Sequence, residues 1–212
     1  MKAKQRDLFS QTRQVFDLPD AKVEYFPGMF EERHATNLLD ALIGKVEWMQ
    51  NTIRFYGKES PVPRLEAWYG DEGKSYAYSG IRMDPKPWIE ELLAVKKAIE
   101  PIAETQFNSV LINYYRDGQD RVAWHSDDEK ELGHNPVIGS VSLGAERKFK
   151  LRHKGFDKND RQAEIMLAHG SLLLMKGPTQ HFWKHEIPRT ARPVGQRINL
   201  TFRVIDPTGE QN

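Results

Sequence analysis

The sequence predicts a mainly β fold with a helical buttress, and two observations indicate it. Two segments with apolar residues at helical spacing occupy the first half of the chain. From Asn108 onward, short apolar runs alternate with Gly, Asp and Asn, which is typical of strands separated by turns. Many short strands in succession favour a β-sandwich or a closed jelly roll. We therefore expect helices first and strands after, with the helices packed against a β core.

The two helices are expected in segments rich in leucine and isoleucine. The first lies within Glu31–Met49, where these residues recur at the spacing of one helical face. The second covers Trp88–Glu100 and follows Pro85 and Pro87, since proline is favoured at the start of a helix.

The strands are expected in six apolar runs, each bounded by turn residues. The runs are Ser109–Tyr115, Val137–Leu143, Lys148–Arg152, Ala163–Leu167, Ser171–Met175 and Gln196–Val204. No internal repeat, low-complexity tract or long linker separates them, so one structural unit is expected.

Composition narrows the class of protein. A chain of 212 residues with 39% hydrophobic residues is long enough for one domain with a substantial core. The absence of cysteine excludes disulfides, iron–sulfur clusters and thiolate zinc sites, and it fits a reducing cytoplasm. Even the longest apolar runs, such as Leu172–Met175, are too short to cross a bilayer, and the basic start is not followed by a signal-like apolar stretch. We expect a cytoplasmic location and no membrane association.

Charge is distributed unevenly along the chain. Residues 145–203 contain 13 Lys and Arg against 5 Asp and Glu, a local charge of +8 in a chain of net charge +1. A basic half suggests a surface for a polyanion, although a solvated charged face would also explain it.

The last strand carries two rows of side chains, because residues two apart in an extended chain share a face. The apolar row should pack on the core, and the polar row then faces water or a polar cavity. Two guanidinium groups in that polar row would suit a small dicarboxylate. The polar row is Arg197, Asn199, Thr201 and Arg203, and the apolar row is Ile198, Leu200, Phe202 and Val204.

A possible metal site is formed by His125-Ser126-Asp127 and a downstream histidine. Two neutral imidazoles and one carboxylate can hold three positions on a non-haem Fe(II) and leave the others open. His181 and His185 are both candidates for the second imidazole. Prolines flank this stretch, so we expect strand and loop there, with His185 as the ligand and His181 at the surface or behind the ligands. Spacing alone does not decide between the two.

Together these motifs resemble the AlkB family of Fe(II)/2-oxoglutarate dioxygenases, particularly the branch that acts on alkylated DNA. The resemblance covers about residues 20–206. Its motifs are Pro63-Arg64, Trp68-Tyr-Gly-Asp71, Tyr76-Ala-Tyr-Ser79, Asn113-x-Tyr-Arg-Asp-Gly118, Trp124-His-Ser-Asp-Asp-Glu129, His185 and Arg197-x-Asn-x-Thr-Phe-Arg203.

The resemblance implies a double-stranded β-helix (jelly roll) with an N-terminal nucleotide-recognition lid. The expected division is an N-terminal extension with helices and lid at residues 1–107 and a jelly-roll core at residues 108–212. It also implies Fe(II) held by His125, Asp127 and His185, and 2-oxoglutarate and O2 as co-substrates. The two arginines would grip 2-oxoglutarate, Arg197 at the distal end and Arg203 nearer the metal, and the pocket would be completed by Asn113, Tyr115, Asn199 and Thr201.

The resemblance also implies a pocket for a damaged base. An extruded base needs aromatic stacking and a partner for its edge, and a cationic lesion favours a nearby carboxylate. Tyr56 would fill the gap left by the base, and Arg64 would contact phosphate. The pocket itself would be lined by Tyr76, Tyr78, Ser79, Asp128 and Glu129.

The implied function is oxidative demethylation of N-alkylated bases in DNA, such as 1-methyladenine and 3-methylcytosine, with 2-oxoglutarate decarboxylation and formaldehyde release. The substrate would be single- or double-stranded alkylated DNA, with RNA as a further possibility, and the enzyme would act as a monomer, in the nucleus if eukaryotic. The alternatives are an RNA demethylase or a protein or lipid oxygenase of the same fold, a non-catalytic nucleic-acid-binding protein, and a structural zinc protein of the cupin type.

Overall fold

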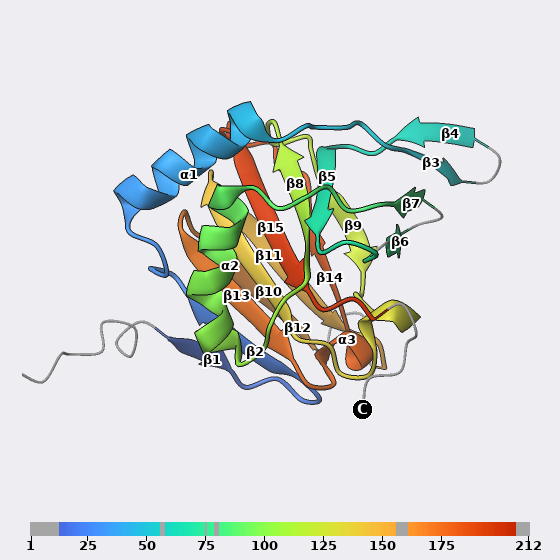
Figure 1. The fold of residues 1–212 in the computed structure, drawn as a ribbon. Coiled ribbons are helices and arrows are strands. Elements are labelled where there is room, and N and C mark those ends of the chain that lie inside the picture. Colours follow the sequence, from blue (N-terminus) through green and yellow to red (C-terminus); the bar gives the residue numbers. More distant parts are fainter. Residues whose placement is uncertain (1–12, 56–57, 75, 79–80, 156–160, 207–212) are drawn as a thin grey trace, which may run out of the picture.

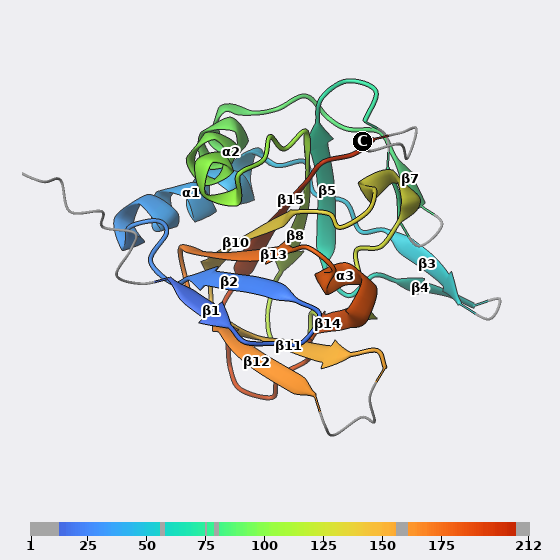
Figure 2. The ribbon, with the colours of Figure 1, turned by 90° about the horizontal axis from the view of Figure 1, so that it is seen from below.

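The computed structural model describes residues 13–55, 58–74, 76–78, 81–155 and 161–206, with residues 53–55, 58, 76–78 and 81–83 described by their backbone alone. Within these residues the chain forms three layers: a pair of helices, a large antiparallel sheet and a smaller one (Figure 1). Figure 2 shows the helices on one face of the large sheet and the small sheet across its other face. This arrangement confirms the predicted double-stranded β-helix with a helical buttress.

The large sheet has seven strands in the order β1-β2-β13-β10-β15-β8-β5, and every neighbouring pair is antiparallel. Its central strands are buried along their whole length because both faces of the sheet are covered. The strands are β1 (Gln14–Phe16), β2 (Lys22–Phe26), β5 (Leu65–Gly70), β8 (Ser109–Tyr115), β10 (Ile138–Gly144), β13 (Ser171–Lys176) and β15 (Arg197–Arg203).

The small sheet has four antiparallel strands in the order β12-β11-β14-β9. The pairing of its last two strands places His185 directly opposite His125. The strands are β9 (Val122–His125), β11 (Arg147–His153), β12 (Gln162–Leu167) and β14 (Trp183–Ile187).

Two long helices cover the outer face of the large sheet. Helix α1 (Glu32–Lys45) lies within its predicted segment. Helix α2 (Glu90–Ala103) overlaps the predicted segment and extends three residues beyond it. Helix α2 continues through Pro101 in its last turn and ends at Glu104, whose left-handed backbone (φ 58°) lets its N–H bond to the Glu100 carbonyl. Two shorter elements, the 3-10 turn η1 (Lys130–Leu132) and helix α3 (Thr179–Phe182), lie near the site described below.

Two apolar cores lie on opposite faces of the large sheet. The core between the helices and the sheet receives the apolar row of β15, as its alternation predicted. The core between the two sheets contains apolar side chains of β2, β11, β13 and β14. The polar row of β15 points into the same inter-sheet space, so the sandwich is polar in that part of its interior.

The expected order of helices first and strands after is wrong in one respect. The N-terminal half contributes β1, β2 and β5 to the large sheet, where β2 pairs with β13 and β5 pairs with β8. The place of β2 and β5 in the sheet depends on partners that are distant in the sequence, β13 and β8, and β1 joins the sheet through β2. Strands from both sides of residue 107 share one sheet. The division into an N-terminal extension and a jelly-roll core therefore stays a prediction about the roles of the two segments.

Two β-hairpins lie outside the large sheet, both on the right-hand side of the molecule in Figure 1. One is formed by β3 (Thr52–Phe55) and β4 (Lys58–Pro61), the other by β6 (Tyr76–Tyr78) and β7 (Ile81–Met83). Isolated bridges from Met49 to Glu66 and from Lys86 to Tyr69 attach their outer ends to β5.

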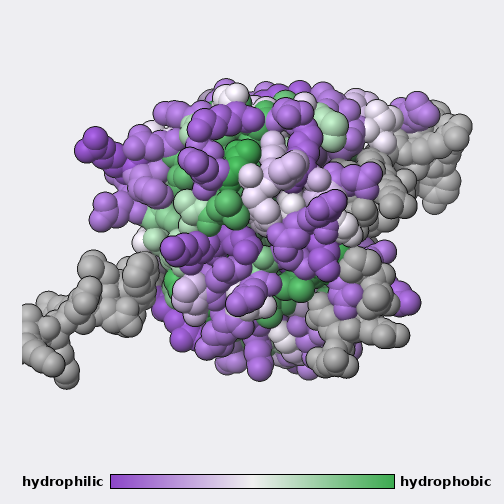
Figure 3. All heavy atoms as spheres, in the orientation of Figure 1, coloured by the Kyte–Doolittle hydropathy of each residue, from purple (hydrophilic) through white to green (hydrophobic). Residues whose placement is uncertain are grey.

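On the face drawn in Figure 3, hydrophilic residues cover most of the described surface and hydrophobic ones form separate patches. This pattern fits amphipathic helices that turn their apolar sides to the sheet. In the described part of the chain, neither α1 nor α2 combines the length and apolar composition that a membrane span requires.

Candidate metal and co-substrate site

The predicted metal ligands converge inside the sandwich. His125 ends β9, Asp127 follows two residues later, and His185 lies in the middle of β14. Because β9 and β14 are paired, the possible ligand atoms of the three residues all lie within 4.8 Å of one another. Among the residues that the structure describes, no other group of three His, Asp or Glu side chains is this close.

The protonation states suit a divalent metal. The Nδ1 of His125 lies 2.8 Å from the Ala123 carbonyl, so this nitrogen carries the proton and Nε2 is left as a ligand. Burial, and then the proximity of His125, lower the pKa of His185 to about 3. Burial acts to raise the pKa of Asp127, but Arg203 and the two imidazoles together lower it to about 2. At neutral pH the site therefore presents two neutral imidazoles and a carboxylate, the donor set that fits Fe(II).

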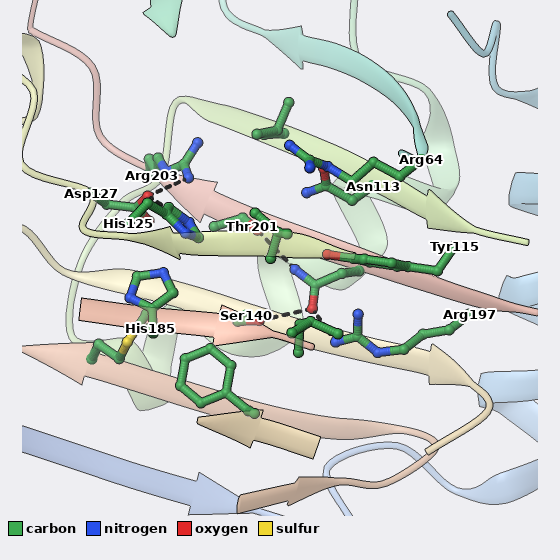
Figure 4. A pocket seen from close by; sticks show the side chains of 16 residues that line it. Arg64, Asn113, Tyr115, His125, Asp127, Ser140, His185, Arg197, Thr201 and Arg203 are labelled. Atoms are coloured by element: carbon green, nitrogen blue, oxygen red, sulfur yellow. Dashed lines mark hydrogen bonds and ion pairs between the residues drawn. The ribbon is translucent and has the colours of Figure 1, made fainter. Parts of the chain in front are cut away.

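Arg203 is the inner of the two predicted arginines. Its Nη2 lies 2.9 Å from Oδ1 of Asp127, and both side chains are almost fully buried. Figure 4 shows this pair beside His125, with Tyr115 and Arg197 at the other end of the cavity. The order expected along β15, Arg203 near the metal ligands and Arg197 distal, is the order that the structure has.

Arg197 is a buried cation that pairs with no carboxylate among the described residues. It is 1% exposed, and its Nη2 donates to Ser142 Oγ (2.9 Å) and Asn199 Oδ1 (2.6 Å). Its Nε and Nη1 have no hydrogen-bond partner among the described residues, and no described carboxylate pairs with it. Burial lowers the pKa of Arg197 to about 10, so it remains charged at neutral pH. A buried cation with two unused donors is a site for an anion.

The cavity between the two ends encloses about 520 Å³, including its opening to solvent. All six predicted co-substrate residues line it: Asn113, Tyr115, Arg197, Asn199, Thr201 and Arg203. A hydrogen-bond chain links the middle of this set, from Ser140 Oγ to Asn199 Oδ1 (3.0 Å) and from Asn199 Nδ2 to Thr201 Oγ1 (2.8 Å). The tyrosine ring of Tyr115 lies 5.0 Å from the Arg197 guanidinium carbon.

Several lining residues were missed from the sequence. Ser140 lines the cavity from β10, opposite Thr201, while Ser142 lies opposite Asn199 and contacts Arg197. A parity count on that predicted strand would have found both. The apolar part of the lining had no such signal, because apolar residues on inner strands look alike whether they face a cavity or the core. It consists of Leu111, Val122, Phe149, Met175 and Ile187.

Arg64 is not the exposed phosphate contact that we expected. It is 5% exposed and lines the cavity, where its Nε donates to Asn113 Oδ1 (2.7 Å) and its Nη2 pairs with Glu66. A further bond runs from Nη1 to the Arg121 carbonyl (3.1 Å). The expectation failed because Glu66, a buried glutamate two residues further along the chain, compensates the charge of Arg64. The sequence did not indicate this pair.

The predicted base-pocket residues are only partly described. Tyr56, Tyr76, Tyr78 and Ser79 lie outside the residues or side chains that the structure describes. Asp128 and Glu129 follow the ligand Asp127 directly, but neither lines the cavity.

His181 lies apart from the metal-ligand cluster. It belongs to α3, a short helix where strand and loop were expected, and its ring contacts that of His134 at 4.9 Å. The side chain in β14 that faces His125 is that of His185, at 4.2 Å between ring centroids.

Comparisons with known proteins agree with this geometry. The profile of the 2OG-Fe(II) oxygenase superfamily matches residues 22–203. The chain is 40% identical over 198 residues to the Mus musculus protein named alpha-ketoglutarate-dependent dioxygenase alkB homolog 3, covering 89% of this chain and 68% of that protein. It is 41% identical over 188 residues to the Bos taurus DNA oxidative demethylase ALKBH2, covering 85% of this chain and 68% of that protein.

Similarity extends to a human relative and to a solved structure. The Homo sapiens DNA oxidative demethylase ALKBH2 is 40% identical over 185 residues, covering 84% of this chain and 71% of that protein. The solved structure of OsALKBH1 has a TM-score of 0.60 and covers 91% of this chain and 99% of that chain. At 16% identity, this last likeness concerns the fold alone.

Proposed function

The chain belongs to the 2OG-Fe(II) oxygenase superfamily and, within it, to the AlkB family, and from this premise we propose that it is a DNA oxidative demethylase. It is an Fe(II)/2-oxoglutarate-dependent dioxygenase with O2 as the second co-substrate. The observation that carries the proposal is the combination, in one cavity, of a His–Asp–His donor set and the buried Arg197 cation, which pairs with no carboxylate in the described part of the chain. A structural zinc protein of the cupin type would have no use for that cation.

In the proposed enzyme, His125, Asp127 and His185 hold the iron. The Ala123 carbonyl keeps the proton of His125 on Nδ1, and Arg203 orients the Asp127 carboxylate. Bound there, Fe(II) with 2-oxoglutarate and O2 supplies the oxidation of an N-methyl group, and the products are succinate, carbon dioxide, formaldehyde and the restored base.

Arg197 is proposed to bind the distal carboxylate of 2-oxoglutarate. Its Nε and Nη1 have no partner among the described residues, and each can donate a charge-assisted hydrogen bond to a carboxylate. Asn199 fixes the guanidinium through its Oδ1 and is itself fixed by Ser140. Because Arg197 and its hydrogen-bond partners are buried, an ionic contact between the guanidinium and a carboxylate is stronger here than it would be in water.

The proposed substrate is an N-alkylated base in DNA, on the strength of relatives named DNA oxidative demethylases. Single- and double-stranded DNA are both proposed substrates, RNA is a second candidate, and the enzyme is proposed to act as a monomer in the cytoplasm or nucleus. We retain the wedge role of Tyr56 as a proposal, together with base-pocket roles for Tyr76, Tyr78, Ser79, Asp128 and Glu129.

The test is formaldehyde release from an oligonucleotide with one 1-methyladenine or 3-methylcytosine. Deoxy and ribo versions, single-stranded and duplex, are compared at equal concentration, with Fe(II) and 2-oxoglutarate omitted in turn. We expect turnover of a deoxy substrate that needs both additions and is lost in His125→Ala. Full turnover by His125→Ala would refute the ligand assignment, and succinate formation without formaldehyde from any oligonucleotide would favour a protein or lipid substrate.

A further inference from the structure

We propose that Gln180 is a positioning residue for the metal centre, because it holds the backbone of the turn that carries Asp127. The inference rests on the proposed role of Asp127 as a metal ligand. Gln180 contacts none of the donor atoms itself, and no sequence motif marked it.

Gln180 is a buried polar side chain whose amide oxygen and amide nitrogen each have a partner. It lies in α3 with 0% exposure, and its Oε1 accepts the backbone N–H of Asp127 at 2.9 Å. Its Nε2 lies 3.5 Å from Sδ of Met175, which lines the cavity. Since a buried polar group costs free energy unless it is hydrogen-bonded, these two contacts fix both the amide and the turn.

Residues on either side of Asp127 are attached to the same elements. Ser126 Oγ donates to the Trp183 carbonyl at 3.0 Å, where β14 begins. Lys154 Nζ lies 2.9 Å from Asp128 Oδ2 and also donates to the Gln180 carbonyl at 2.9 Å. Three consecutive residues of the turn are thus each fixed to α3, to β14 or to the lysine that bridges them.

This arrangement links the two ligand-bearing segments. Strand β14 carries His185, and α3 immediately precedes it. A turn fixed to α3 therefore keeps the Asp127 carboxylate at a constant separation from the His185 ring. The β9–β14 pairing does the same for His125, but β9 ends at His125, so Asp127 lies beyond the ladder. Gln180 supplies the attachment that the ladder does not.

The experiment is a Co²⁺ titration of the metal-free full-length protein, followed by visible absorption and by calorimetry. Gln180→Met has nearly the same length but no acceptor, and it should weaken Co²⁺ binding by about 10- to 100-fold, as is usual when a partner behind a metal ligand is lost. Gln180→Glu keeps an acceptor oxygen and should bind Co²⁺ within a few-fold of the wild type.

Thr179→Val is the matched control on the same helix. Thr179 is 1% exposed, and its Oγ1 bonds to the Lys176 carbonyl and the Lys22 N–H, away from the ligands. This variant should lower the melting temperature and leave the Co²⁺ affinity unchanged. A loss of affinity in Thr179→Val equal to that in Gln180→Met would overturn the inference, because any damage to α3 would then suffice.

The outcomes separate the inference from the proposed function. If the wild-type protein binds no Co²⁺, or binds it as well as His125→Ala does, the metal site itself is wrong. If the wild type binds and Gln180→Met binds within twofold of it, Gln180 has no positioning role. Should Gln180→Met not fold, Ser126→Ala takes its place, since it removes the neighbouring contact; an unchanged Co²⁺ affinity in Ser126→Ala then counts against the inference.

Discussion

Replacing Arg197 by methionine tests the anion site most directly. The substitution keeps an unbranched side chain of similar length and removes the guanidinium that is buried at the distal end of the cavity. We expect binding of 2-oxoglutarate to be lost selectively, with the fold and the metal ligands intact.

The size of the effect follows from two donors. Nε and Nη1 of Arg197 are without partners among the described residues, and each would make a charge-assisted hydrogen bond worth about 1.5–3 kcal/mol. Together they amount to about 3–6 kcal/mol, which corresponds to a loss of affinity of about 10²- to 10⁴-fold. The 2-oxoglutarate affinity of Arg197→Lys should lie between those of the wild type and Arg197→Met, because an ammonium retains the charge but not the planar set of N–H donors.

Stability without 2-oxoglutarate should change little, because two effects oppose each other. Burial that lowers the pKa of Arg197 to about 10 means that the charged form costs the folded state about 3 kcal/mol, which methionine recovers. The hydrogen bonds to Ser142 and Asn199 are lost, but Asn199 Oδ1 still accepts from Ser140.

The assay is calorimetric binding of 2-oxoglutarate to the Co²⁺-loaded protein, together with the rise in melting temperature that 2-oxoglutarate produces. In Arg197→Met that rise should vanish, while the melting temperature of the free protein stays within a few degrees of the wild type. A dissociation constant within threefold of the wild-type value would refute the reasoning, since the proposed distal carboxylate site would then contribute nothing.

Three further predictions concern the ligands and the backbone. Asp127→Asn should weaken Co²⁺ binding more than 100-fold. It should also lower the free energy of unfolding in urea by about 3–5 kcal/mol, because the buried Arg203 loses its ion-pair partner. A stability equal to that of the wild type would show that Asp127 does not compensate the buried charge of Arg203. The pKa of His185 is lowered from 6.5 to about 3, so between these pH values His185 is protonated in the unfolded chain and neutral in the folded state. The stability of the metal-free protein should therefore be full above pH 6.5 and fall toward pH 3, by up to about 1.4 kcal/mol per pH unit from this group; urea midpoints at pH 7 and pH 5 should show a smaller difference in His185→Gln, and an unchanged difference would contradict the assignment. Gly144→Ala should lower the melting temperature by about 4–8 °C, because its φ is +92° and an added Cβ would lie 2.3 Å from the Gln196 carbonyl oxygen; Gly44→Ala, in α1 with open space around it, should not, and equal effects of the two would remove the steric explanation.

The spacing of apolar residues was sufficient to predict which side chains are buried wherever that depends on one strand or helix alone. The alternation on β15 correctly separated the cavity row from the core row, and β8 was predicted with its exact bounds. The end of α2 was placed too early because Pro101 normally stops a helix, whereas here it lies in the last turn.

Long-range pairing accounts for what the sequence did not reveal. Strand β2 is a five-residue segment whose assignment depends on β13, which lies far along the chain. The burial of Arg64 depends on Asn113, which lies on β8, as well as on Glu66 two residues further along the chain. The contact between Gln180 and Asp127 joins residues 53 positions apart, and nothing in either local pattern indicates it.

The two hairpins that leave and rejoin β5 have a practical consequence. Each forms a sheet of its own, and the bridges at Met49–Glu66 and Tyr69–Lys86 mark where its surroundings meet the scaffold. A hairpin transplanted from a relative between these junctions would leave every ladder of the large sheet in place. Because Tyr56, Tyr76 and Tyr78 are proposed to contact the base, we expect such chimeras to change target preference while His125 on β9 and His185 on β14 keep their places.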